Sequence, residues 1–123
     1  RLAVELARRD GGPRWLISSF RAATVERCRR AMPGVRTAYL SYDLSPATVA
    51  RAASRRHDAI HPFVDLVDEA SIRHAHASGL AVNVWTCDDP DRMRELVAWG
   101  VDGICTNLPD VALAVRRELV DRP

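Results

Sequence analysis

The chain has 123 residues, of which 47% are hydrophobic and 28% are charged, and its formal net charge at pH 7 is +2. This composition is typical of one globular domain that is large enough to bury a hydrophobic core. The 18 basic residues, all of them Arg, are dispersed, and so small a net charge does not indicate nucleic-acid binding. We also find no signal peptide, and no apolar run long enough to span a membrane.

The two ends of the chain and its cysteines give weaker expectations. Residues 1–10 have the pattern of the end of an amphipathic helix without an initiator Met, which predicts that a longer protein precedes them. Cys28, Cys87 and Cys105 lack CxxC spacing, and their odd number argues against a disulfide framework. We expect Cys28, on a helix, and Cys105, in a buried strand, to act as small apolar residues. A reducing compartment, the cytoplasm, is the simpler expectation.

The first half of the chain alternates short apolar runs with amphipathic segments. Residues 15–20 follow a Gly-Gly-Pro turn and have the apolar pattern of a buried parallel strand. A helix is expected over residues 21–31, because Pro33-Gly34 then stops it. The next strand is expected at 35–40 and the next helix at 44–56, with Ser45 as N-cap and Pro46 in its first position.

The same alternation continues to the carboxyl terminus. Glycines follow two of the expected helices, as Gly79 and Gly100, which is typical of a helix C-terminus. We expect strands at residues 57–62, 81–86 and 102–106, and helices at residues 68–78, 89–99 and 109–120.

Five strands, each followed by a helix, predict parallel pairing, since a crossover helix joins parallel neighbours. An open doubly wound sheet and an α/β barrel both satisfy this pattern. In a barrel, side chains at the carboxyl ends of the strands carry function. A complete eight-stranded barrel needs about 250 residues, so this chain would be roughly half of one.

Common catalytic signatures are missing from the sequence. There is no GxGxxG or Walker loop for a nucleotide, and no GxSxG elbow for a serine nucleophile. His57 and His61 would share one face of a strand, which weakly suggests a metal site, whereas His74 and His76, two apart on a helix, would not. We favour structural or surface roles for His57, His74 and His76, and leave His61 open because it ends a strand.

The acidic residues near the fourth expected helix have a structural explanation. Asp89 and Asp91 fall where a helix N-terminus favours negative charge, so capping is preferred over metal binding. Asp88 stays undecided between the two roles.

The aromatic residues divide by position. Trp15 and Trp99 are expected between the sheet and the helices. Trp85 ends a strand, where it could offer a flat apolar wall to a ligand while its indole N–H finds a polar partner. Phe20 suits a pocket or the core equally well.

Taken together, five fragments resemble the glycerophosphodiester phosphodiesterase family in order and spacing over nearly the whole chain. They are Ser18-Ser19-Phe20, Tyr39-Leu40, Ile60-His61-Pro62, Val84-Trp85-Thr86 and Gly100-Val101-Asp102-Gly103-Ile104-Cys105-Thr106-Asn107-Leu108-Pro109-Asp110.

The resemblance implies an α/β fold of the TIM-type (β/α) barrel, of which residues 1–123 would be the last five β-α units. Members of the family hydrolyse glycerophosphodiesters to an alcohol and glycerol 3-phosphate, usually with a divalent cation such as Mg²⁺ or Ca²⁺. The family's HRG-type histidine, second histidine, acidic metal ligands and lysine come from earlier strands. None of those motifs occurs in this sequence, so no catalytic and no metal-binding residue is assigned here.

The resemblance does assign a substrate side. Phe20 and Trp85 match the wall around the glycerol moiety, and His61 matches a strand end facing the same cavity. Ser19 and Thr106 are weaker candidates for polar contacts there. The sequence departs from the family at two places: it has Asp88 where Asn is common, and Asn107 where Asp is common.

We therefore expect the carboxyl-terminal part of a phosphodiester hydrolase, inactive by itself because it lacks the groups that neutralise phosphoryl charge and move protons. The alternative is a noncatalytic half-barrel that binds a ligand or assembles with a partner chain. An HRG motif encoded upstream would favour the enzyme, and a start codon close to Arg1 would favour the binding module. Unpaired sheet edges also predict self-association or poor solubility of the isolated segment.

Overall fold

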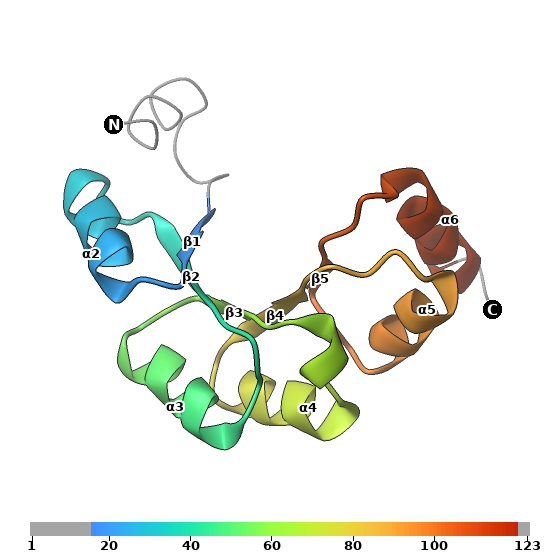
Figure 1. Ribbon diagram of the computed structural model, residues 1–123, viewed down its shortest axis with the longest axis horizontal. Coiled ribbons are helices and arrows are strands. Elements are labelled where there is room, and N and C mark those ends of the chain that lie inside the picture. Colours follow the sequence, from blue (N-terminus) through green and yellow to red (C-terminus); the bar gives the residue numbers. More distant parts are fainter. Residues whose placement is uncertain (1–15, 121–123) are drawn as a thin grey trace.

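A computed structural model describes residues 16–120, in which each strand is followed by an α-helix (Figure 1). A single 3-10 turn, Val64–Leu66, interrupts the connection between β3 and α4. The elements are β1 (Leu16–Ser19), α2 (Ala22–Ala31), β2 (Arg36–Leu40), α3 (Pro46–Ser54), β3 (Ala59–His61), α4 (Glu69–Ala77), β4 (Ala81–Val84), α5 (Pro90–Ala98), β5 (Gly103–Ile104) and α6 (Pro109–Val120).

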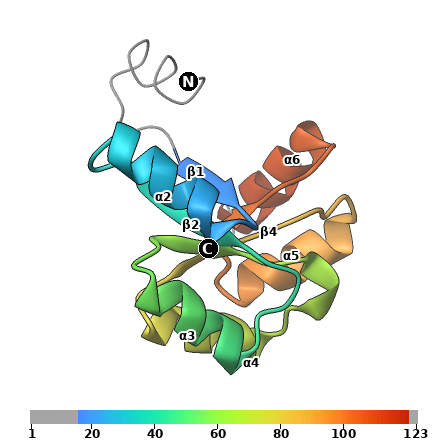
Figure 2. The ribbon, with the colours of Figure 1, turned by 60° about the vertical axis from the view of Figure 1, so that its left-hand side comes forward.

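The described strands form one five-stranded sheet in the order β1-β2-β3-β4-β5, and every neighbouring pair is parallel. The helices follow one another around the strands, with α3 and α4 side by side in both ribbon views (Figures 1 and 2). A doubly wound sheet would reverse its strand order at a switch point and carry helices on both faces. The sequential order instead confirms the α/β fold of a partial (β/α) barrel.

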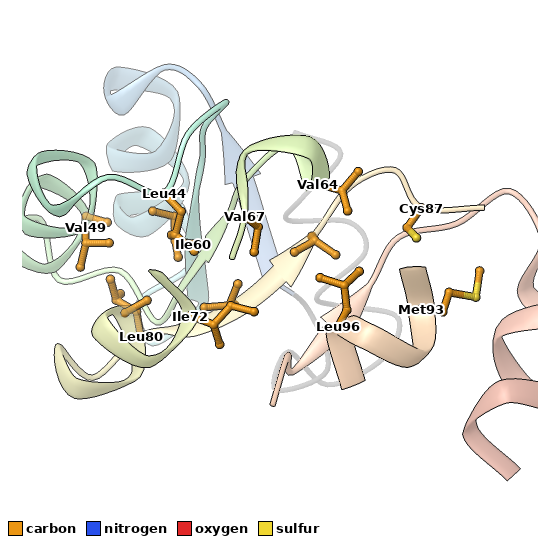
Figure 3. Packing of buried hydrophobic residues seen from close by; sticks show 14 of the residues in the cluster. Leu44, Val49, Ile60, Val64, Val67, Ile72, Leu80, Cys87, Met93 and Leu96 are labelled. Carbon is orange, nitrogen blue, oxygen red and sulfur yellow. The ribbon is translucent and has the colours of Figure 1, made fainter. Parts of the chain in front are cut away.

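The core lies between the strands and helices α3 to α5 (Figure 3). Ile60 and Val82, on adjacent strands, belong to the same buried cluster as Val49 and Ile72 of the helices, and all four are fully buried. Because β-strand side chains alternate between faces, the residues between these apolar ones in β3 and β4 face the opposite side of the sheet. That opposite side carries His61 and Asn83.

The expected helix ends are confirmed by their caps. The Ser45 hydroxyl accepts a hydrogen bond from the Thr48 N–H, and the Asp89 carboxylate accepts one from the Asp91 N–H. Gly79 and Gly100 follow α4 and α5 with φ of +81° and +86°, a left-handed conformation that glycine adopts without strain.

The strands are shorter than expected, which corrects one prediction. β5 ends at Ile104, so Cys105 lies beyond the strand and is exposed rather than buried. Its N–H still donates to the Val84 carbonyl, but its side chain has left the packed layer. Cys28 is half-buried in α2, as expected of a small apolar residue.

Two predictions fall outside the described residues: the helix over residues 1–10, and the position of Trp15. Trp99 lies where it was expected, half-buried against the core at the end of α5. Within residues 16–120, none of the helices has the length and apolar character needed to cross a membrane.

Candidate functional site

Aromatic side chains gather where the parallel strands end. Phe20 follows β1, Tyr42 follows β2, Phe63 follows β3 and Trp85 follows β4. Their rings contact one another, and we call these four residues the aromatic wall. Its location at the carboxyl ends of the strands is where an α/β barrel carries its functional groups.

Trp85 is at the centre of the aromatic wall. Its ring centroid lies 5.1 Å from that of Phe63, 5.9 Å from that of Tyr42 and 6.3 Å from that of Phe20. The Phe20 and Tyr42 rings stack at 5.1 Å, and they are 46% and 63% exposed. Two rings are therefore ordered against Trp85 and yet open to solvent, which suits a surface that packs against the carbon skeleton of a ligand.

The backbone around Trp85 is held on three sides. Its N–H donates to the Pro62 carbonyl at 3.1 Å, and its carbonyl accepts from the Val64 N–H at 2.7 Å. The indole Nε1–H donates to the His61 carbonyl at 2.8 Å. The polar partner expected for the indole is thus present, and the ring is fixed to β3 as well as to its own strand. The Trp85–Thr86 peptide bond is cis.

The loop that carries Tyr42 is fixed by Asp43. The Asp43 carboxylate accepts hydrogen bonds from the Thr48 hydroxyl at 2.8 Å and the Ser45 N–H at 3.2 Å. Interactions with Ser45 contribute most to lowering the pKa of Asp43, with Thr48 adding to them. On the other side, the Phe63 N–H donates to the Tyr42 carbonyl at 2.9 Å. Tyr42 is therefore held in place although its side chain is exposed.

His61 ends β3 beside the aromatic wall, and its side chain meets Asn83 of β4. The Nε2 atom of His61 lies 2.9 Å from Nδ2 of Asn83. Burial lowers the pKa of His61, which favours the neutral imidazole. The structure thus brings His61 together with Trp85, as the sequence indicated, and adds Asn83 to the pair.

The two weaker polar candidates have local partners. The Ser19 hydroxyl accepts a hydrogen bond from the Arg21 N–H at 3.0 Å, at the start of α2. The Thr106 hydroxyl donates to the Asp88 carboxylate at 2.8 Å and accepts from the Leu108 N–H at 3.0 Å. Both side chains lie at the carboxyl ends of strands, where their hydroxyls order the following turns.

Asp88, which the sequence left undecided, joins two loops. Its carboxylate accepts hydrogen bonds from the Asn107 N–H at 2.7 Å and the Asn107 side-chain amide at 3.0 Å, besides that of Thr106. These bonds lower its pKa, the Asn107 side chain contributing most. Asp88 therefore connects the loop after β4 to the loop after β5.

The expectation that His57 and His61 share a strand face is wrong. β3 begins only at Ala59, so His57 precedes the strand and lies at the opposite end of the sheet from His61. There it is 7% exposed, and its Nδ1 lies 3.0 Å from the Thr37 hydroxyl. His76 pairs instead with Asp102 at 2.7 Å, and His74 is exposed on α4. These three histidines have the structural or surface positions that were favoured.

Residues 16–120 contain no group of three or more His, Cys, Asp or Glu side chains that could hold a metal ion. The ligand set for a divalent cation does not therefore assemble from these residues. What the site does offer is an apolar wall, a histidine whose lowered pKa favours the neutral ring, and an amide, which are groups suited to binding and orienting a ligand.

Three members of the site were missed in the sequence: Tyr42, Phe63 and Asn83. Tyr42 and Phe63 each lie two residues beyond the end of a strand, so their position was available as a signal once the strands were placed. Asn83 lies within an otherwise apolar strand, and an amide in that setting could have been marked as facing the cavity side.

The fold and site define a protein of the parallel α/β barrel class with an aromatic wall at the carboxyl ends of its strands. Residues 2–111 match the model of the glycerophosphoryl diester phosphodiesterase family. The chain belongs to this family.

Similar proteins support the same assignment. A 48-residue stretch is 42% identical to a probable glycerophosphodiester phosphodiesterase 2 of Mycobacterium tuberculosis, covering 39% of this chain and 18% of that protein. A crystal structure assigned as a glycerophosphoryl diester phosphodiesterase from Silicibacter pomeroyi superposes with a TM-score of 0.84 at 27% identity, covering 97% of this chain and 43% of that one.

An Oleispira antarctica phosphodiesterase in complex with the product sn-glycerol-3-phosphate has a TM-score of 0.82 at 19% identity, covering 93% of this chain and 47% of that one, a likeness of fold. The chain thus spans less than half the length of these solved relatives.

Proposed function

We propose that this chain supplies the substrate-binding side of a glycerophosphodiester phosphodiesterase, which hydrolyses a glycerophosphodiester to an alcohol and glycerol 3-phosphate. The observation that carries the proposal is the aromatic wall centred on Trp85, at the carboxyl ends of four parallel strands. Family membership supports the reaction class. Residues 1–123 would then form the last five β-α units of one barrel domain, with its earlier strands outside this sequence.

In this proposal the described residues bind and orient the substrate. The rings of Phe20 and Trp85 pack against the carbon face of the glycerol moiety, and their packing excludes water from that side. His61 contacts the same moiety from the end of β3, while Ser19 and Thr106 offer weaker polar contacts. Orientation of this kind lowers the barrier by holding the phosphodiester where the reacting groups can reach it.

The bond-breaking groups would come from elsewhere in the protein. Hydrolysis needs a general acid and base and neutralisation of phosphoryl charge, and a divalent cation, Mg²⁺ or Ca²⁺, would supply the last of these in the whole enzyme. The described residues do not assemble ligands for that cation. We therefore propose that the 123-residue chain alone does not turn over substrate.

The test is an assay of the intact protein with glycerophosphodiesters that differ in their alcohol, following the release of glycerol 3-phosphate with Mg²⁺ or Ca²⁺ present. Trp85→Ala removes the centre of the wall and is expected to lower kcat/KM by about tenfold or more. Leu113→Ala is the control, because Leu113 is an exposed apolar residue on α6 and does not belong to the wall. Equal activity of the two variants would contradict the proposal.

A second assay addresses the segment alone. The 123-residue chain is expected to show no turnover under the same conditions. Turnover that disappears in Trp85→Ala or His61→Gln would overturn the proposed inactivity, because it would place the bond-breaking groups within this chain.

The unpaired sheet edges favour a second candidate, a noncatalytic half-barrel that acts as a ligand-binding or assembly module. Within the described residues, β1 and β5 each pair on one side only, which supports self-association of the isolated chain.

We also propose a reducing, cytoplasmic location, which three free cysteines support. Targeting of the intact protein to an oxidising compartment would contradict that location.

A further inference from the structure

Asn83 and His61 form a hydrogen bond whose direction follows from chemistry. Nδ2 of Asn83, which lies 2.9 Å from Nε2 of His61, has hydrogens to give and no lone pair to accept with. With the amide in this orientation, Nδ2 donates and Nε2 of the ring accepts. A neutral imidazole that accepts at Nε2 carries its proton on Nδ1.

Gly103 determines where the Asn83 amide can lie. The two residues are partners in the parallel register between β4 and β5. A Cβ added at Gly103 would meet Oδ1 of Asn83 at 2.5 Å and Cγ at 3.2 Å, both closer than side chains normally pack. The missing side chain at Gly103 thus provides the space in which the amide turns toward His61.

The surroundings of the His61 ring favour its uncharged form and hold the residue beside the aromatic wall. Burial is the cause of its lowered pKa, with no charged neighbour adding to it. Its main-chain carbonyl accepts the indole N–H of Trp85, which ties the residue to the aromatic wall. The described residues provide no hydrogen-bond partner for Nδ1 of the ring.

We infer that Asn83 is a positioning residue that holds His61 in the Nδ1–H form, so that this N–H donates a hydrogen bond to a ligand oxygen beside the aromatic wall. The ligand oxygen belongs to the glycerol phosphate end of the substrate, and in this part the inference rests on the proposed function. His61 then acts as a neutral donor that selects for an acceptor oxygen. It transfers no proton.

The tautomer is measured directly by nitrogen NMR of the histidine rings in the intact protein labelled with ¹⁵N-histidine. The His61 signals are assigned by their loss in His61→Gln. We expect the protonated nitrogen to be Nδ1 in the unmodified protein. An Nε2–H ring at His61 would overturn the inference whatever the protein's activity.

Three variants test the role of Asn83 and its space. Asn83→Leu removes the donor at similar size, and the fixed Nδ1–H preference should be lost. Asn83→Asp places a carboxylate beside Nε2, so the His61 pKa should rise and the ring should become imidazolium. Gly103→Ala changes neither partner, yet it should displace the amide and act like Asn83→Leu. The buried His57 ring, held by Thr37, is the internal control and should keep its signals.

Ligand binding tests the donor role separately. Saturating sn-glycerol 3-phosphate should shift the His61 ring signals, and Asn83→Leu should weaken its binding about three- to tenfold, as expected for one hydrogen bond. Glycerol and inorganic phosphate as further probes distinguish a hydroxyl acceptor from a phosphoryl acceptor. Binding that leaves His61 unchanged overturns the donor role alone. No binding of any of the three probes overturns the proposed function and the donor role, while the tautomer result stands by itself.

Discussion

Asp88 accepts hydrogen bonds from both nitrogens of Asn107, the main-chain N at 2.7 Å and Nδ2 at 3.0 Å. These are the two positions where the sequence departs from the pattern of the family it resembles, which commonly has Asn first and Asp second. The two departures therefore face one another across neighbouring loops. A carboxylate and an amide can form this side-chain hydrogen bond in either order, so exchanging the two residue types should preserve it.

The exchange predicts non-additive effects on stability. Asn107→Asp alone would set two carboxylates against each other and should lower Tm most, while Asp88→Asn alone loses the charge-assisted bonds and should lower it less. The double variant restores one carboxylate and one amide, so its Tm should lie above that of Asn107→Asp. Thermal melts of the unmodified protein, the two single variants and the double variant test this. Purely additive shifts in Tm would contradict the expectation that the two residue types can be exchanged.

Buried His57 predicts loss of stability in mild acid. Burial, followed by the charges of Arg29 and Arg55, lowers the pKa of His57 in the folded state. The unfolded chain, whose histidines titrate near about pH 6.5, then binds the proton more readily. Stability is therefore complete above that pH and falls as the pH drops toward the lower folded-state pKa. Urea midpoints measured between pH 8 and pH 5 should decline accordingly.

Variants separate the contribution of His57 from that of other groups. His57→Gln should flatten the decline, leaving a remainder from His61, whose pKa is lowered in the same direction. His74→Gln, at an exposed site on α4, is the matched control and should keep the full decline. Equal slopes in the two variants would show that His57 is not the titrating group.

Thr37 links His57 to α2 at the end of the sheet opposite the aromatic wall, and we expect its hydroxyl to contribute to stability. Its hydroxyl accepts from the Arg29 guanidinium at 2.8 Å and lies 3.0 Å from Nδ1 of His57. Because Thr37 is almost fully buried, Thr37→Val should lower the free energy of unfolding by about 1–3 kcal/mol, through the partners that it leaves unsatisfied. Thr37→Ser keeps the hydroxyl and should cost less, and chemical unfolding of both variants provides the comparison.

The sequence predicted the repeating strand and helix units well, because Ser45 and Asp89 cap α3 and α5, and Gly79 and Gly100 follow α4 and α5. It could not choose between an open sheet and a barrel, since strand order depends on long-range pairing. Two residues of the aromatic wall, Phe20 and Trp85, could be singled out from the sequence because each ends an expected strand. Tyr42 and Phe63 lie just beyond strand ends, which was a usable signal, but their contact with Trp85 also depends on loop geometry set by Asp43 and by main-chain bonds. The place of His57 depended on where β3 begins, and strand ends are poorly marked in sequence.

Open sheet edges predict that the isolated 123-residue chain self-associates. β1 and β5 form the described edges of the sheet, and several large apolar side chains are exposed, Val120 at 71% among them. Unpaired strand edges and apolar patches favour association with further copies. Sedimentation velocity over a range of concentrations should show a sedimentation coefficient that rises with concentration. A compact monomer at every concentration, with no binding of an apolar dye, would contradict this expectation.

We expect Arg92, which is not part of the aromatic wall, to stabilise the backbone segment that holds Trp85. Its guanidinium donates to the carbonyls of Val64 and Val67 at 2.9 Å each and lies over the Trp99 ring, while the Val64 N–H holds the Trp85 carbonyl. Arg92→Met keeps a long apolar side chain but loses both carbonyl bonds, the ion pair with Glu95 and the cation over Trp99, so the free energy of unfolding should fall by about 1.5–3 kcal/mol. The control is Arg94→Met, which breaks only exposed ion pairs and should cost about 0–1 kcal/mol. Chemical unfolding measures both losses, and faster hydrogen exchange at the Val64 amide in Arg92→Met alone would show that the effect reaches the wall through the main chain. Unchanged exchange at Val64 would mean that Arg92 stabilises α5 without supporting Trp85.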